Sequence, residues 1–221
     1  MTGIRENIKR LKDEVPGNIS LVAVSKTKPV ADILAAYNEG QRIFGENRVP
    51  ELVSKRSQLP ADIEWHMIGH LQTNKVKMLI PGVALIHSID SLKLLETVNR
   101  ESERAGVITG CLLQFHIAAE ETKSGFLPDE ADEIFQSQLF RSLSSVSIRG
   151  VMGMATFTDD MDRVRIEFRK LKETFIILKS KYFPENASFR EISMGMSGDY
   201  KIAIEEGATM IRIGSLIFGS R

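Results

Sequence analysis

The chain has 221 residues, 43% of them hydrophobic and 26% charged, and its formal net charge is zero. This composition is that of an ordinary globular protein, and the balanced charge argues against a broad basic surface and therefore against a nucleic acid partner. The sequence contains neither an apolar stretch of the roughly 18 residues that span a bilayer nor a signal-peptide core, so we expect a cytoplasmic protein without membrane association.

An amphipathic helix is predicted first, over Ile4–Glu14, because apolar residues recur there at spacings of four and three. After a break at Pro16, strand-like and helix-like patterns alternate along the chain. Eight strands are predicted at Ser20–Ser25, Arg42–Gly45, Glu64–Gly69, Ala84–Ile89, Gly110–Ile117, Ser147–Met154, Arg190–Met194 and Thr209–Gly214. Helices are predicted between them at Ala31–Glu39, Val49–Gln58, Asn74–Leu79, Ser91–Arg104, Asp129–Ser142, Met161–Lys181 and Asp199–Glu206.

Strands that alternate with helices imply parallel pairing through right-handed crossovers. Eight such units predict an α/β protein with a single (β/α)8 TIM-type barrel over residues 1–221, preceded by an extra N-terminal helix. A doubly wound open sheet is the alternative. The glycine-rich dinucleotide fingerprint of that fold is missing after the first strand, where Ser25–Pro29 reads Ser-Lys-Thr-Lys-Pro.

The first predicted strand ends on Lys26, and the chain then turns at Pro29. In a barrel the chemistry lies at the carboxyl ends of the strands. Burial at such a position favours the neutral amine, which can attack a carbonyl and form a Schiff base. A lysine that simply ends a strand at the surface is the alternative interpretation.

The ends of the last two strands are rich in glycine and serine. Ser193–Asp199 reads Ser-Met-Gly-Met-Ser-Gly-Asp and leads into a helix, and Ile213–Ser215 reads Ile-Gly-Ser. Backbone N–H groups, hydroxyls and a helix N-terminus together form an anion site, and barrels commonly hold phosphate in these two loops. Two tight turns that merely need glycine are the alternative.

The last strand also carries an arginine on its predicted inner face. Met210, Arg212 and Gly214 share one face, while Ile211 and Ile213 share the other and suit contact with helices. An arginine inside a barrel is costly unless it is paired. A lysine amine, an arginine and a phosphate cradle in one mouth describe a pyridoxal phosphate (PLP) site, where the lysine forms the imine and the arginine faces the pyridine nitrogen.

All four histidines, His66, His70, His87 and His116, lie in or just beyond predicted strand ends. The spacing of four between His66 and His70 would suit a metal on a helix, but on a strand it separates the two side chains, and no metal site is predicted. For His66, a core position with satisfied hydrogen bonds is the alternative to ligand contact.

Six segments occur in a consistent order: Ala23–Pro29, Phe44–Val49, Trp65–Lys75, Lys123–Phe126, Met194–Ser197 and Arg212–Gly219. Through them the chain resembles the pyridoxal phosphate homeostasis protein family, whose fold is similar to the N-terminal barrel of alanine racemase. The resemblance implies PLP as the cofactor, Lys26 as the imine lysine and Arg212 as the partner of the pyridine nitrogen. The other cofactor-binding residues that it implies are Ser197, Gly214 and Ser215 at the phosphate, Met194, Gly195 and Met196 in the turn beside it, and Asn47, Ile68 and Gly69 along the ring.

Two positions depart from the family pattern. His116 stands where the family often has asparagine, and Pro50 interrupts the usual run after Arg48. Both departures leave the residues on the cofactor side untouched, and they bear only on what could be assigned to a substrate side.

By this resemblance the protein is a carrier that holds PLP as a releasable lysine imine, serves intracellular PLP homeostasis and passes the cofactor to PLP-requiring enzymes. It is expected to be a monomer without robust catalytic activity, and any activity would be weak and racemase-like.

The first alternative is a PLP-dependent amino-acid racemase. Racemases of this fold resemble this barrel with a C-terminal β-domain that contributes a tyrosine base, and we expect that domain to be absent because the chain ends at Arg221. Of the three tyrosines, only Tyr200 is expected near the barrel mouth. A cofactor-free, lysine-dependent aldolase is a further alternative, but it would not need Arg212 inside the barrel.

Overall fold

The computed structural model describes residues 2–119 and 124–219, and it contains a closed barrel of eight parallel strands. Each strand pairs with the next along the chain, and the last pairs with the first, so the predicted (β/α)8 barrel is confirmed. The strands are β1 (Ser20–Val24), β2 (Ile43–Glu46), β3 (Glu64–Met67), β4 (Leu85–Ile89), β5 (Thr109–Gln114), β6 (Val146–Met152), β7 (Glu191–Ser193) and β8 (Met210–Ile213).

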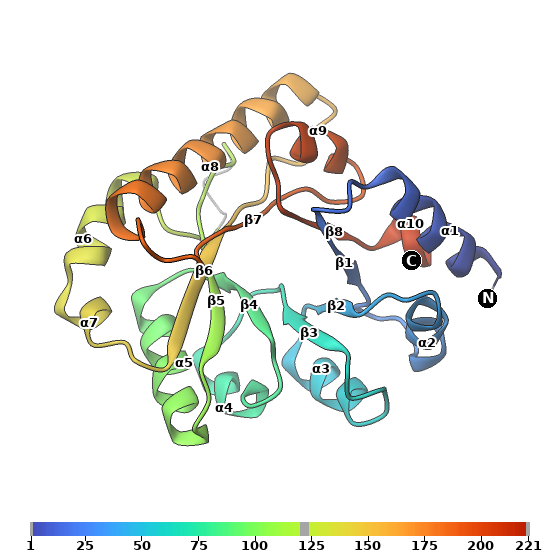
Figure 1. Cartoon of the computed structure of the whole chain (residues 1–221), viewed down its shortest axis with the longest axis horizontal. Helices are drawn as coiled ribbons and strands as arrows, with labels where there is room; N and C mark the ends of the chain where they lie inside the picture. The colour runs from blue at the N-terminus through green and yellow to red at the C-terminus, as the bar shows by residue number, and fades with distance from the viewer. Residues whose placement is uncertain (1, 120–123, 220–221) are drawn as a thin grey trace.

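Helices lie outside the ring of strands (Figure 1). They are α1 (Thr2–Glu14), α2 (Val30–Asn38), α3 (Val49–Arg56), α4 (Val76–Leu79), α5 (Leu92–Ala105), α6 (Ala131–Gln136), α7 (Gln138–Arg141), α8 (Met161–Tyr182), α9 (Tyr200–Glu205) and α10 (Ser215–Phe218), with 3-10 turns η1 (Thr73–Lys75) and η2 (Pro128–Glu130). The extra N-terminal helix is confirmed as α1, which packs against α2 and α10. None of the helices in the described ranges is long and apolar enough to cross a membrane.

The alternation of side chains along each strand separates two apolar layers. The inside of the barrel is filled by a small cluster formed by Val22, Leu85, Leu112, Met152 and Met210. The much larger layer between the strands and the helices includes Ile211 and Ile213. The predicted orientation of β8 is therefore confirmed, with the isoleucines toward the helices and Met210 inside.

Several elements differ between the prediction and the structure. The single helix expected over Asp129–Ser142 is a 3-10 turn followed by two short helices, because Ser137 is extended (φ −62°, ψ 146°) and its hydroxyl caps α7 by accepting the N–H of Phe140. The fifth strand ends at Gln114 rather than Ile117. The four-residue helix α10 was not predicted, because one turn shows no apolar periodicity.

Candidate functional site

A cavity of about 540 Å³ opens at the carboxyl ends of the strands. Its walls come from the loops after β1, β2, β3, β6, β7 and β8, which is where the barrel places chemistry. Most of the residues that the sequence singled out line this cavity, namely Lys26, Asn47, Ile68, Met196, Ser197, Arg212, Gly214 and Ser215.

Three of the singled-out residues support the cavity without lining it. Met194 is fully buried in the outer core. Gly195 has φ +88°, and a Cβ there would lie 2.5 Å from the Cβ of Ala203. A Cβ on Gly69 would lie 2.5 Å from the carbonyl oxygen of Asn47. Glycine at both positions therefore permits a close approach that shapes the neighbouring loops.

Lys26 follows β1 and lines the cavity, as Val24 does two residues earlier. The next residue, Thr27, has φ 65°, a left-handed conformation that is unusual for a β-branched side chain. Lys28 also lines the cavity, but its ammonium donates to the carbonyl oxygens of Phe218 at 3.0 Å and Gly219 at 3.3 Å, at the end of α10. The Lys28 ammonium is thus engaged by backbone carbonyls at the rim.

The two glycine- and serine-rich loops meet across one wall of the cavity. The N–H of Gly214 donates to the hydroxyl oxygen of Ser197 over a long 3.3 Å, and Ser215 follows directly. The carboxylate of Asp199 accepts the N–H of Met196 at 2.5 Å and closes the first loop. The Ser197 hydroxyl and the Gly214 N–H are therefore placed together, and both can donate to an anion.

Arg212 extends from β8 to the cavity floor and is 4% exposed. Its guanidinium donates to the hydroxyl of Ser193 at 2.6 Å and to the carbonyl oxygen of Gly153 at 3.1 Å. Burial lowers the pKa of Arg212 to about 10, and the Asp199 carboxylate opposes that shift. Arg212 is therefore a cation at neutral pH, fixed in position by two acceptors.

Behind Arg212, two histidines continue the hydrogen-bonded chain into the barrel. The Ser193 hydroxyl lies 2.9 Å from Nδ1 of His87, and Nε2 of His87 lies 3.0 Å from Nδ1 of His66. Burial lowers the pKa of His66 to about 3, and burial followed by the charges of His66 and Arg212 places the pKa of His87 well below its usual value. Both rings are neutral, and neither lines the cavity.

The other two histidines have separate surroundings. His70 is mostly exposed, with Nδ1 3.1 Å from a carboxylate oxygen of Asp90. His116 has a buried Nδ1 without a hydrogen-bond partner among the described residues. Within residues 2–119 and 124–219, no three His, Cys, Asp or Glu side chains form a metal-binding group. Lys123, which opens one of the six segments, lies outside the described residues.

A buried carboxylate that the sequence did not single out holds the β6–α8 loop at the opposite wall. Glu167 of α8 accepts the backbone N–H of Thr156 at 2.6 Å, its hydroxyl at 2.7 Å and the N–H of Ala119 at 3.2 Å. Burial raises the pKa of Glu167, but the hydrogen bonds from Thr156, Arg163 and Ala119 outweigh it and hold the pKa below its usual value. A glutamate in mid-helix gives no sequence signal for such a role.

Tyr200 does not face the cavity, which corrects its expected place near the mouth. Its hydroxyl donates to a carboxylate oxygen of Glu14 on α1 at 2.8 Å, and its ring is buried. Burial, followed by the hydrogen bond to Glu14, raises the pKa of Tyr200 to about 12. Among the described residues that line the cavity there is neither a tyrosine nor a histidine.

Comparisons with known proteins identify relatives of this chain. The family model "Alanine racemase, N-terminal domain" matches residues 1–221. The chain is 41% identical over 202 residues to the pyridoxal phosphate homeostasis protein of Aquifex aeolicus, covering 91% of this chain and 86% of that protein. The corresponding protein of Helicobacter pylori strain 26695 is 42% identical over 202 residues, covering 90% of this chain and 87% of that protein.

Solved structures extend the similarity to three dimensions. PipY of Synechococcus elongatus without PLP superposes with a TM-score of 0.91 at 35% identity, covering 98% of this chain and 100% of PipY. The same protein with PLP bound gives a TM-score of 0.85 at 34% identity, with the same coverage. Alanine racemase of Clostridium difficile shares the fold, with a TM-score of 0.76 at 14% identity, covering 100% of this chain and 56% of the racemase.

Proposed function

Because the chain belongs to the pyridoxal phosphate homeostasis protein family and matches the alanine racemase N-terminal domain, we propose that it binds PLP in the barrel-mouth cavity and serves intracellular PLP homeostasis. One observation carries the proposal: Lys26, Arg212 and the Ser197–Gly214 pair all open into a single cavity. PLP-requiring enzymes are the recipients in this proposal. PipY, a relative of similar size, has been solved with PLP bound.

The residues that are present fit such a ligand. Asn47 lines the cavity, and its Oδ1 is buried without a hydrogen-bond partner among the described residues. A buried oxygen without a donor is costly, and a bound polar ligand can supply the donor. Arg212 places a fixed positive charge at the cavity floor, and Gly214 and Ser197 offer donors at one wall. This donor-rich site suits an anionic ligand with both ring and phosphate atoms.

When bound, PLP supplies an aldehyde that condenses with an amine and a phosphate that accepts N–H and O–H donors. In this proposal Lys26 holds the cofactor as an imine, formed at its Nζ with release of water. Ser197, Gly214 and Ser215 bind the phosphate. Asn47 and Ile68 flank the ring.

Arg212 in this proposal donates to the pyridine nitrogen. An arginine offers only donors and stays protonated at physiological pH, so it disfavours a proton on the nitrogen it faces. A ring without that proton withdraws electrons less strongly, and carbanion chemistry is less favoured. Such a site suits storage and release of the cofactor better than turnover.

The first prediction is that Lys26 carries the cofactor. Purified protein mixed with PLP and reduced with borohydride is expected to yield one modified peptide, with the adduct on Lys26. Lys28 is the matched internal control, because it lines the same cavity and its ammonium is bound by two carbonyl oxygens. Peptide mapping by mass spectrometry gives the position, and an adduct on Lys28 or Lys75 instead would refute the assignment.

The second prediction is that amino-acid racemisation is weak or absent. Racemisation through PLP needs a base on each face of the cofactor. Lys26 can serve one face, but Tyr200 is bound to Glu14 outside the cavity, and the described cavity lining has no histidine. Chiral chromatography after incubation with L-alanine and PLP is expected to show no more D-alanine than PLP alone gives. An authentic alanine racemase is the positive control, and turnover comparable to it would overturn this prediction.

A further inference from the structure

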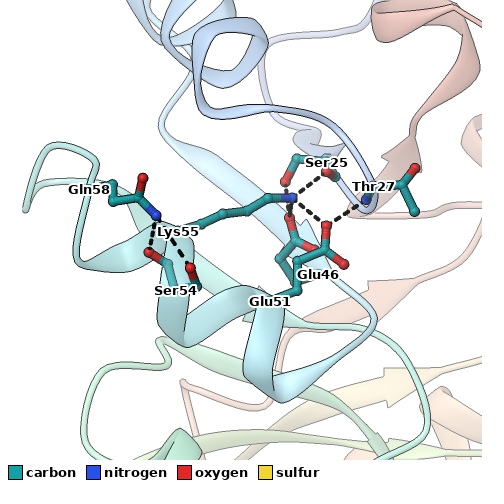
Figure 2. Close-up of polar contacts among 7 residues, drawn as sticks. All are labelled: Ser25, Thr27, Glu46, Glu51, Ser54, Lys55 and Gln58. Atoms are coloured by element: carbon teal, nitrogen blue, oxygen red, sulfur yellow. Dashed lines mark hydrogen bonds and ion pairs between the residues drawn. The ribbon is translucent and has the colours of Figure 1, made fainter.

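A buried charged cluster lies on the outer side of the barrel, between α3 and the ends of β1 and β2 (Figure 2). The ammonium of Lys55 on α3 lies 2.8 Å from a carboxylate oxygen of Glu46 and 2.6 Å from one of Glu51. Glu46 also accepts the hydroxyl of Ser25 at 2.6 Å. The side chains of Lys55 and Glu46 are only 8% and 0% exposed.

This cluster holds the backbone on both sides of Lys26. Lys55 donates to the carbonyl oxygen of Ser25 at 2.8 Å, which belongs to the peptide group before Lys26. Glu51 accepts the N–H of Thr27 at 2.6 Å, which belongs to the peptide group after Lys26. The two bonds come from residues that also contact each other, so one ion pair on α3 fixes both peptide groups that flank the cavity lysine (Figure 2).

The left-handed residue Thr27 lies within this arrangement. A β-branched residue at φ 65° is unfavourable unless its surroundings hold it there. The bond from the Thr27 N–H to Glu51 is one such restraint, and the bond from the Lys28 N–H to the Ser25 carbonyl oxygen at 3.0 Å is another. Glu51 and Lys55 are one helical turn apart, and Pro50 occupies the first turn of α3, where its missing N–H costs nothing. Pro50, one of the two departures from the family pattern, therefore lies in the first turn of the helix that carries Glu51 and Lys55.

Stability alone does not explain a buried ion pair in an otherwise apolar layer. Transfer of charges out of water offsets much of their attraction, and apolar residues of similar volume often serve a helix–sheet contact as well or better. Burial raises the pKa of Glu46 against the opposing hydrogen bonds from Lys55 and Ser25, and its second oxygen has no partner among the described residues. The cluster is thus costly, and its specific contacts are with the backbone beside Lys26.

We propose that Glu51 and Lys55 are positioning residues that fix the backbone around Lys26 and so set how its amine enters the cavity. We call the bonds from Lys55 to the Ser25 carbonyl oxygen and from the Thr27 N–H to Glu51 the clamp. Its purpose rests on the proposed function, but the clamp itself is a property of the cofactor-free chain. Neither residue lines the cavity, so each acts through Lys26 rather than on the ligand.

Amide hydrogen exchange of the cofactor-free protein tests the clamp directly. The Thr27 amide is expected to be protected in the parent, and Glu51→Ala should speed its exchange at least tenfold. Glu51→Gln keeps a carbonyl acceptor and should leave the exchange near the parental rate. Arg56→Met is the matched control. It removes a cation from the same helix, but the hydrogen bond of Arg56 goes to the carbonyl oxygen of Pro81 and not to the backbone beside Lys26.

The loaded protein gives a second readout. Glu51→Ala and Lys55→Met are expected to raise the PLP dissociation constant about tenfold and to shift the pH dependence of PLP absorbance, while Glu51→Gln and Arg56→Met leave both unchanged. Because Lys55→Met removes a buried partner and can unfold the chain, Glu51→Ala decides the matter, since the Glu51 side chain is 22% exposed.

The outcomes separate the two proposals. Circular dichroism shows whether Glu51→Ala is folded. If it is folded and its Thr27 amide exchanges faster, the clamp is supported. Failure of the parent protein to bind PLP would then remove only the proposed function. Unchanged Thr27 exchange in that variant overturns the clamp, and so does equal acceleration in Arg56→Met.

Discussion

Replacing Arg212 with methionine is expected to weaken PLP binding about a hundredfold while leaving the barrel folded. A hydrogen bond to a charged donor contributes about 1.5–3 kcal/mol, and the upper part of that range corresponds to a hundredfold change in affinity. Methionine occupies similar space but donates nothing. Fluorescence titration of the variant and the parent with PLP measures the difference.

The same substitution is expected to change the free energy of unfolding of the cofactor-free protein by only about 1 kcal/mol. Burial holds the pKa of Arg212 at about 10 rather than 12.5, so keeping this cation at neutral pH costs about 3 kcal/mol. Methionine removes that cost, which offsets the lost hydrogen bonds to Ser193 and Gly153. Urea unfolding measures the balance.

Arg190→Met is the matched control, because Arg190 is an exposed arginine at the other end of the barrel and is paired with Glu191. It should change neither affinity nor stability. Unchanged affinity in folded Arg212→Met would show that Arg212 does not contact the cofactor.

Replacing Glu167 with alanine is expected to lower the free energy of unfolding by about 3 kcal/mol at pH 7. The variant leaves the buried Thr156 N–H and the Thr156 hydroxyl without their acceptor, each at a cost of about 1.5 kcal/mol, while the Ala119 N–H keeps the Thr156 hydroxyl oxygen as its second acceptor. Because Thr156 lines the cavity, PLP affinity is expected to fall as well. Glu173→Ala, an exposed site on the same helix, should have little effect.

The difference in the free energy of unfolding between the parent and Glu167→Ala has a defined pH dependence. The pKa of Glu167 in the folded protein lies below its usual value, so its contribution is fully present above the pKa of the unfolded chain and is lost as the pH falls through the folded pKa. The gap between parent and Glu167→Ala in urea unfolding should therefore narrow from pH 7 toward acid. A gap that stays constant over that range would mean that the carboxylate charge does not carry the effect.

The features that could be predicted from the sequence are those that follow from the local periodicity of apolar residues. Alternation of strands and helices predicts the barrel, and alternation along Met210–Ile213 predicts that Arg212 points inward. Which residues of a glycine-rich turn line the cavity is decided by the turn's own dihedral angles, as Gly195 shows with φ +88°, so the sequence could not tell that Met194 and Gly195 lie behind the cavity lining.

Contacts between distant parts of the chain left no sequence signal. His87 and Ser193 are 106 residues apart, and only the closure of the barrel brings them together. Glu51 and Lys55 look like an ordinary surface pair one helical turn apart, and their burial against β1 and β2 depends on how α3 packs. Tyr200 follows a strand end by only a few residues, yet the packing of α1 draws its hydroxyl away from the mouth.

The chain of hydrogen bonds from Arg212 to His66 also favours one direction for the protons in it. Arginine cannot accept, so the Ser193 oxygen receives the guanidinium N–H, and the acceptor that the described contacts offer for its own proton is Nδ1 of His87. His87 then carries its proton on Nε2 and donates to Nδ1 of His66, which leaves His66 protonated on Nε2 alone. In this arrangement each imidazole is a single tautomer oriented by one cation, and nitrogen NMR tests it, because the same tautomers in the parent and in Arg212→Met would show that Arg212 does not set them.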